Sequence, residues 1–226
     1  MDLARLAMLQ LADSAFPSGA YTLSHGLETL VAEGLVGDAM DLAAALDVAL
    51  RARLGRTDLP ALLAAWDAAP DLAPAIAVDR RLSAAKLARE EREASARVGL
   101  RLAVEVGRLT SAPILATFVA AIEEGRTPGN GAVALGLAAR DLGIARRDAA
   151  LLAGYGFANG FVSAALRLGR IGHGVAQRLL REAGPAIVAA VDLAQTTDPD
   201  DLFACAPMFD VAMARHETAP VRLFAT

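Results

Sequence analysis

Apolar residues recur every three to four positions along most of the chain, the spacing of helices that each bury one face. The first two helices are expected over residues 3–11 and from Thr22 or Ser24 to Gly34, with a break at 13–19 where Pro17 and Gly19 interrupt the pattern. A third helix is expected over residues 41–54, and a fourth begins at a Thr57 cap and ends near Trp66. The remaining helices are expected over residues 71–82, 83–109, 113–124, 133–142, 148–170, 175–195 and 198–217. Residues 218–226 should fray. We therefore predict an all-α, single-domain bundle of roughly eight to eleven helices over residues 1–226.

The expected helix over residues 83–109 is the longest and the most charged. Its acids and bases alternate four residues apart, which predicts the ion pairs Glu93–Arg97 and Arg101–Glu105. A helix of this kind packs one narrow face and leaves the rest in solvent. The residues expected on the packed face are Leu87, Ala94, Val98, Leu102 and Val106.

The segment 148–170 is apolar nearly all round, which places it at the centre of the bundle. Its uncharged run, residues 149–166, is about the minimum length of a membrane span, but its glycines and Asn159 make insertion unfavourable, so we expect no membrane partner. Gly156 and Gly160 are interpreted as small residues that allow close helix packing. In the next helix, Pro185 predicts a kink near residues 182–184.

Composition and charge exclude some classes of protein for this chain. Apolar residues make up 55% of the 226 positions, which excludes a disordered chain, and a formal charge of -4 provides no basic surface for nucleic acid. The lone cysteine, Cys205, and an N-terminus without a signal-peptide pattern predict a cytoplasmic protein. The apolar excess and the small residues around Gly156 and Gly160 also predict a homodimer built largely by residues 113–193.

Known catalytic motifs are missing from the sequence. The single lysine, Lys86, does not follow glycine, so the phosphate-binding loop of nucleotide hydrolases is impossible. The histidines His25, His173 and His216 stand far apart, which predicts no metal cluster and no resident cofactor. A weak metal contact at His25 with Glu28, or at His216 with Glu217, stays open, but helix capping is the simpler interpretation.

Three segments carry a resemblance to a known family. Residues 8–28 (MLQLADSAFPSGAYTLSHGLE) match the pattern L-Q-L-x-D/S-x-x-x-P-x-G-x-Y/F-x-x-S-x-G-L-E, with which the UreF family of urease accessory proteins opens. Residues 206–217 (APMFDVAMARHE), with Arg222-Leu223-Phe224, resemble that family's ending. Residues 167–177 (RLGRIGHGVAQ) are similar to R/K-x-x-P-L-G-Q-x-x-G-Q. Departures at Arg170, His173 and Ala176 predict an unusual shape or charge for this loop.

The resemblance implies an all-helical homodimer that is not an enzyme and that works with UreD (also called UreH), the GTPase UreG and apo-urease. It would bridge UreD-bound apo-urease and UreG, and couple GTP hydrolysis to nickel insertion. Residues 198–226, rich in phenylalanine yet interrupted by Asp-Pro and Ala-Pro steps, are expected to depend on a partner for order.

Tyr21, Glu28 and Arg167 are the first candidates for the surface that faces the GTPase. Tyr21 could equally anchor the Pro17–Gly19 turn, and Arg167 could pair with a structural carboxylate. The alternative function is a small helical hydrolase or lyase that uses His216 as base and Glu217 as the orienting acid. The full set of candidate partner-binding residues is Tyr21, Ser24, His25, Glu28, Arg167, Gln177, Arg215, His216 and Glu217.

Overall fold

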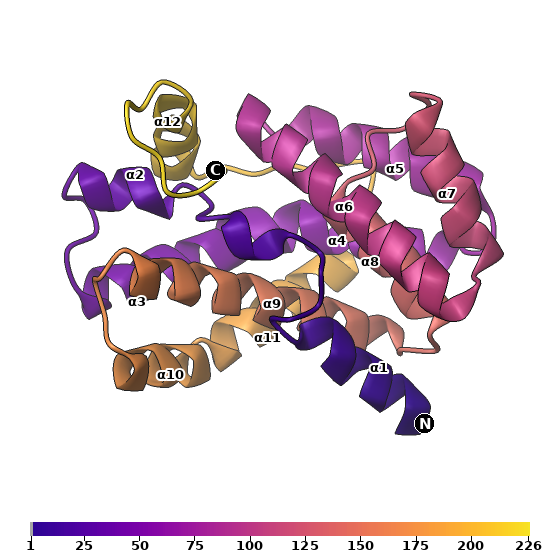
Figure 1. The fold of residues 1–226 in the computed structure, drawn as a ribbon, viewed down its shortest axis with the longest axis horizontal. Coiled ribbons are helices and arrows are strands. Elements are labelled where there is room, and N and C mark those ends of the chain that lie inside the picture. Colours follow the sequence, from indigo (N-terminus) through magenta and orange to yellow (C-terminus); the bar gives the residue numbers. More distant parts are fainter. Residues whose placement is uncertain (1) are drawn as a thin grey trace.

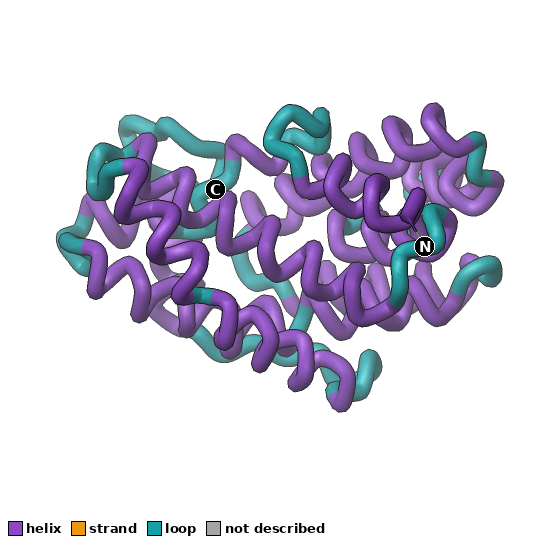
Figure 2. Tube along the Cα trace, turned by 90° about the horizontal axis from the view of Figure 1, so that it is seen from below, coloured by secondary structure: helices purple, strands orange, loops and turns teal. Residues whose placement is uncertain are grey.

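A computed structural model describes residues 2–226 as an all-α bundle, and these residues contain no strand, so the predicted fold class is confirmed (Figures 1 and 2). The helices are α1 (Asp2–Ala12), α2 (Leu27–Ala32), α3 (Ala39–Val48), α4 (Asp58–Ala68), α5 (Leu72–Ala85), α6 (Arg89–Thr110), α7 (Pro113–Glu123), α8 (Gly131–Asp141), α9 (Arg146–Arg167), α10 (His173–Glu182), α11 (Gly184–Thr196) and α12 (Pro207–His216).

Local capping explains several helix starts. The Asp38 carboxylate accepts hydrogen bonds from the amides of Met40 (2.8 Å) and Asp41 (3.0 Å), so it satisfies donors that the first turn of α3 leaves free. Pro113 occupies the first turn of α7, where its missing N–H costs little. The predicted cap at Thr57 is wrong, because its hydroxyl donates backwards to the Arg53 carbonyl (2.9 Å) and caps no amide of α4.

The expected helix over 41–54 ends early. After α3, the chain forms a π turn over Ala49–Arg53 and a short 3-10 turn over Leu54–Arg56. Gly55 lies against α11 at this point, and a Cβ there would sit 3.2 Å from backbone atoms of Ala190. The altered winding therefore lets two backbones approach closely, which helical periodicity alone does not reveal.

The expected helix over 83–109 also differs in the structure. The helix before it continues to Ala85, and α6 begins only at Arg89. In the break, Lys86 turns inward to an ion pair, and Leu87, predicted to be packed, is 70% exposed. The charges of α6 pair as Arg89–Glu93 and Glu105–Arg108, so the two predicted ion pairs do not form.

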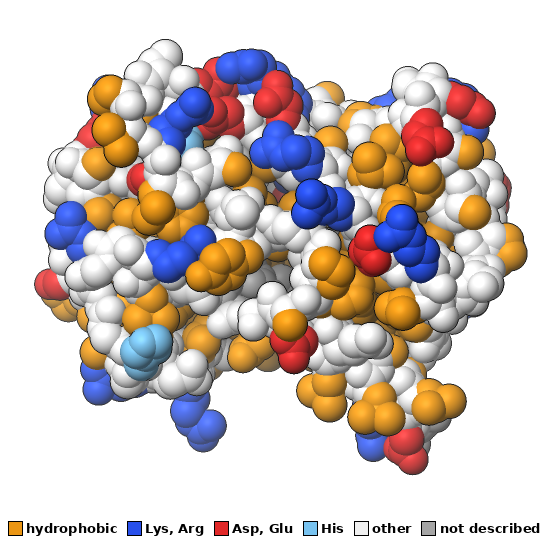
Figure 3. Space-filling view, in the orientation of Figure 1, with side chains coloured by type: hydrophobic (Ala, Val, Ile, Leu, Met, Phe, Trp, Pro, Cys, Tyr) orange, Lys and Arg blue, Asp and Glu red, His pale blue; other side chains and the backbone are white. Residues whose placement is uncertain are grey.

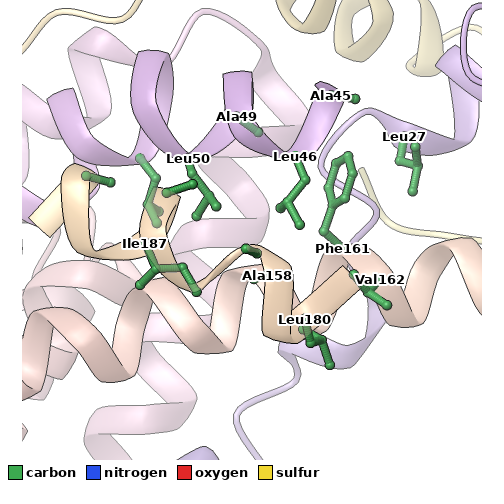
Figure 4. Close-up of a cluster of buried hydrophobic side chains, with 14 of the residues drawn as sticks. Leu27, Ala45, Leu46, Ala49, Leu50, Ala158, Phe161, Val162, Leu180 and Ile187 are labelled. Atoms are coloured by element: carbon green, nitrogen blue, oxygen red, sulfur yellow. The ribbon is translucent and has the colours of Figure 1, made fainter. Parts of the chain in front are cut away.

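The core consists of two hydrophobic clusters. The larger surrounds α9 and gathers apolar residues of α2, α3, α10, α11 and α12, whereas the smaller joins α5, α6, α7 and α8 to α4. Figure 4 shows part of the larger cluster, in which Leu46 lies beside Phe161 and Leu50 lies near Ile187. The predicted central place of α9 is therefore confirmed.

Only α9, among the described residues, is long and apolar enough to cross a membrane, and half of its apolar window is buried inside the bundle. The predicted kink is confirmed where Ala183 alone separates α10 from α11.

At the other end of the chain, α1 protrudes from the bundle, and hydrophobic side chains gather on that protrusion (Figures 1 and 3). The exposed leucines of α1 are Leu3, Leu6 and Leu9.

The expectation that residues 218–226 fray is wrong. We call these residues the C-terminal strap, because they fold back across the N-terminal part of the chain. The amide of Ala225 donates to the Thr22 carbonyl (2.9 Å), and the ring of Phe224 is buried in the larger cluster. Phe209 of α12 is buried there as well, so α12 is a piece of the core. Long-range contacts thus order a segment that has little local propensity of its own.

The interpretation of Gly156 and Gly160 as residues that allow close packing within the bundle is also wrong. A Cβ added at either position would meet no atom within 4 Å. Their neighbour Gly154 is the tightly packed one, since a Cβ there would lie 2.7 Å from Cγ2 of Ile187. The helix therefore uses Gly154 for contact with α11, and leaves open space along the turns that carry Gly156 and Gly160.

This difference predicts opposite effects of the same substitution. Gly160→Ala should stabilise the protein by about 0.5–1 kcal/mol, because alanine favours a helix interior and meets no neighbour. Gly154→Ala should destabilise it by about 1–3 kcal/mol through overlap with Ile187. Urea unfolding of both variants measures the difference, and equal effects would contradict this account of α9.

Candidate functional site

A cavity of about 490 Å³ lies beside the open face of α9, within the size range of ligand pockets. Its walls come from the segment between α1 and α2, from the π turn, and from α4, α6, α8 and α9. Gly156 and Gly160 line it, so the missing side chains of α9 create the space. Most of the lining is apolar, but the cavity also reaches Tyr21, His25 and Arg167.

At one side of the cavity, the Arg167 guanidinium lies between two aromatic rings. Its central carbon is 4.0 Å from the centre of the Tyr21 ring and 4.2 Å from that of Phe224. Tyr21 itself is largely exposed, and it follows Gly19, whose φ of 80° permits the turn. Burial lowers the pKa of Arg167, but an arginine remains protonated in proteins. The stack joins the N-terminal turn, α9 and the C-terminal strap at one point.

Behind this stack, four polar side chains contact one another and the strap. The buried His216 ring contacts Glu90 through Nδ1 (2.6 Å) and Glu28 through Nε2 (2.9 Å). Glu28 also accepts hydrogen bonds from the strap amides of Leu223 (2.7 Å) and Phe224 (3.1 Å). Arg222 of the strap donates to the second oxygen of Glu90 (2.6 Å). We call Glu28, Glu90, His216 and Arg222 the clasp.

Ser24 adds a further contact between the two chain ends, because its hydroxyl and its amide both donate to the Thr226 carbonyl. The next residue, His25, has a φ of 55°, and its ring packs on Phe157 with the ring centres 4.5 Å apart. Burial and the nearby positive charge of Arg53 lower the pKa of His25 to about 4. A neutral imidazole therefore lines the cavity at neutral pH.

A second group of charges, Arg53, Asp58, Lys86 and Glu91, lines another part of the cavity wall. Lys86 Nζ contacts both carboxylate oxygens of Asp58 (2.8 Å each) and lies 3.7 Å from Glu91, which also binds Arg53 (2.9 Å). Burial alone raises the pKa of the Asp58 carboxyl, but the Lys86 charge and its hydrogen bond outweigh burial and hold that pKa below its usual range. Two cations and two anions thus balance inside the protein.

The structure brings together six of the predicted residues around the strap. They are Tyr21, Ser24, His25, Glu28, Arg167 and His216. Three others lie apart: Arg215 pairs with Glu33 (2.9 Å), Glu217 binds Arg89 (3.3 Å), and Gln177 is exposed on α10. Of the departures from the family pattern, Arg170 and His173 are exposed and Ala176 is buried.

His216 and Glu217 do not form the pair that the alternative enzyme requires. The ring of His216 is enclosed by Glu28 and Glu90, whereas Glu217 turns to Arg89, because successive residues at a helix end point in different directions. Within residues 2–226, no group of three or more His, Cys, Asp or Glu side chains is placed to hold a metal ion.

Sequence reasoning missed Arg53, Asp58, Glu90 and Glu91 as parts of the site. The signal that could have found them is Lys86, the one lysine of the sequence. It stands beside the apolar Leu87 just before an acidic segment, which is a poor start for a surface helix. Pairing across 28 residues, from Asp58 to Lys86, has no periodic signature in the sequence.

Comparison with known proteins places the chain among urease accessory proteins. Residues 36–184 match the family model named UreF. The urease accessory protein UreF of Arthrobacter sp. (strain FB24) is 34% identical over 97% of this chain and 96% of the relative. The protein of that name from Bacillus sp. (strain TB-90) is 33% identical over 97% of this chain and 97% of the relative. The one from Trichodesmium erythraeum is 30% identical over 98% of this chain and 96% of the relative.

The low pKa of His25 predicts a pH dependence of stability. The unfolded chain takes up a proton below about pH 6.5, whereas the folded protein resists it down to about pH 4, so stability falls as pH falls through this window. The loss attributable to His25 should reach about 3 kcal/mol. His25→Asn, which tolerates a positive φ, should flatten the dependence in urea unfolding. His173→Asn should keep it, and an unchanged slope in His25→Asn would contradict the assignment.

The buried charges predict a large cost for breaking one pair. Lys86→Met should destabilise the protein by about 3 kcal/mol, because Asp58 is left buried without its main cation. Combining it with Asp58→Leu should recover most of that loss, since neither charge then remains. Arg51→Gln, which breaks an exposed pair with Asp47, should cost less than about 0.5 kcal/mol. Urea unfolding of the three variants checks this order.

Proposed function

Because this chain belongs to the UreF family of urease accessory proteins, we propose that it bridges UreD (UreH)-bound apo-urease and the GTPase UreG. In this role it couples GTP hydrolysis by UreG to insertion of nickel into the urease active site. The protein itself acts by binding and not by catalysis. An adaptor of this kind works only if it binds one state of the GTPase better than the other, since a partner shifts an equilibrium through differential affinity.

One observation carries the proposal: the Tyr21–Arg167–Phe224 stack joins two surfaces that would meet different partners. Tyr21, 59% exposed, is the part of the stack that a GTPase could contact. Tyrosine and arginine are enriched among the residues that dominate binding energy. The strap supplies the second ring, Phe224, so a partner that binds the strap acts on a ring that covers Arg167.

UreD is assigned to the C-terminal segment, residues 198–226. This segment leaves apolar side chains in solvent although α12 and Phe224 belong to the core, and such a surface favours a protein partner. Its order would then depend in part on UreD. The exposed residues that support this assignment are Phe203, Met208, Val211, Val221 and Leu223.

We also propose that the protein acts in the cytoplasm as a homodimer and forms one domain. Tyr155 and Val188 are exposed apolar residues within the predicted dimer region, residues 113–193. The two hydrophobic clusters share partly buried side chains, among them Leu135 and Leu142, which supports one cooperative unit. Nickel is the cargo of the assembly in this proposal and not a resident cofactor of this chain.

The two docking surfaces should be separable by mutation. Tyr21→Ala and Arg167→Gln should reduce co-purification of UreG with the UreD complex at least tenfold while UreD remains bound. Val221→Asp with Leu223→Asp should instead reduce binding of UreD, because both side chains are exposed and only the backbone amide of Leu223 joins the clasp.

Arg178→Gln, on α10, is the matched control and should leave both partners bound. Light scattering should show that each variant keeps the mass of the wild type, and urea unfolding should show that each variant is folded under the conditions of the binding assay. Undiminished UreG recovery with both Tyr21→Ala and Arg167→Gln would refute the assignment of that surface.

A further inference from the structure

The cavity beside α9 has a hydrogen-bond donor in its wall that no acceptor satisfies. Nη2 of Arg167 is buried and has no hydrogen-bond partner within residues 2–226. Nε of the same group reaches only the Ser163 carbonyl, at 3.4 Å. Because the Tyr21 and Phe224 rings lie over the two faces of the guanidinium, its free N–H groups point along its own plane. Donors in this arrangement suit the two oxygens of a carboxylate, and a buried donor without an acceptor costs free energy.

Arg167 also carries a charge that no acid of the cavity wall neutralises. The second group of charges in the wall balances two cations with two anions. Asp13, the remaining acid of the wall, is exposed and accepts the Ala15 amide (2.7 Å). His25 is neutral at neutral pH, because burial lowers its pKa to about 4. Within residues 2–226, Arg167 is therefore the one cation of the wall that contacts no carboxylate.

The wall next to Arg167 combines a polar row with open space. Asn159 and Ser163 precede Arg167 by eight and four residues, so all three lie on one face of α9, and all three line the cavity. Gly160 lies within this row, and a Cβ there would meet no atom within 4 Å. The volume of about 490 Å³ is that of a site for a small organic molecule. Much of the remaining wall is apolar and includes Leu59, Leu102, Leu135 and Phe157.

We propose that this cavity binds a small organic acid, a monocarboxylate with an aliphatic body. The carboxylate accepts hydrogen bonds from the edge of the Arg167 guanidinium, and the aliphatic body lies against the apolar wall beside Gly160. A carboxylate fits better than a phosphate monoester, because one unpaired cation balances one negative charge and a phosphate carries up to two. This inference goes beyond the proposed function, since binding requires only the free protein and neither UreD nor UreG.

The test is calorimetric titration of the full chain with octanoate at pH 7.5, where the carboxylate is ionised. Octanamide has the same chain length without the charge, and it should bind at least tenfold more weakly because charge-assisted hydrogen bonds are the stronger ones. Acetate has the charge without the aliphatic body, and it should also bind at least tenfold more weakly because it buries little apolar surface.

Two variants test the two ends of the site. Gly160→Leu fills the space beside α9 and should weaken octanoate binding at least tenfold, while leucine in a helix interior keeps the fold. Arg167→Met keeps apolar bulk but removes the donors, so it should bind octanoate and octanamide equally. Arg170→Gln, which removes an exposed arginine three residues away, is the matched control and should keep the wild-type affinities.

Urea unfolding shows that each variant is folded at pH 7.5. If Gly160→Leu does not fold, the ratio of the two affinities in Arg167→Met decides. Three results would overturn the proposal: no heat of binding for octanoate with the wild type, undiminished affinity in folded Gly160→Leu, or a preference for the acid over the amide that persists in Arg167→Met. The second of these would mean that octanoate binds elsewhere, for example on the exposed leucines of α1.

Discussion

The need to pair buried charges is the constraint on which much of this structure depends. Leaving water is costly for an ion unless an opposite charge and hydrogen bonds meet it inside the protein. Two such groups exist here: the clasp around His216, and the cluster of Arg53, Asp58, Lys86 and Glu91. Each joins elements far apart in sequence, so each fixes how α6 sits against other parts of the bundle.

The cavity beside α9 depends on residues that are small. Helices normally bury their inner faces against one another at high density, and open space forfeits those contacts. The glycines of α9 leave such space on one side while Gly154, two residues away from Gly156, packs tightly on α11. One helix thus serves the core on one face and the candidate site on the other.

The clasp also explains what several residues of the family resemblance do in the folded protein. The first resembling segment contains Glu28, and the last contains His216 with Arg222 nearby. In the structure these three meet with Glu90 of α6, which no resembling segment includes. Glu28 and His216, which the sequence suggests as partner-binding residues, therefore hold parts of the same chain together. Among the first candidates, only Tyr21 presents most of its surface to solvent.

The sequence by itself determined the helical class, the central position of α9, the kink at residues 182–184 and the family, because helical periodicity, proline and ordered motifs are local signals. Only the tertiary structure decided that Lys86 ends a helix, that Gly156 and Gly160 face open space, and that the strap docks on Glu28. These features depend on pairing and packing between residues 28 to about 200 positions apart, and the free energy of such contacts exceeds the local propensities that a linear pattern records.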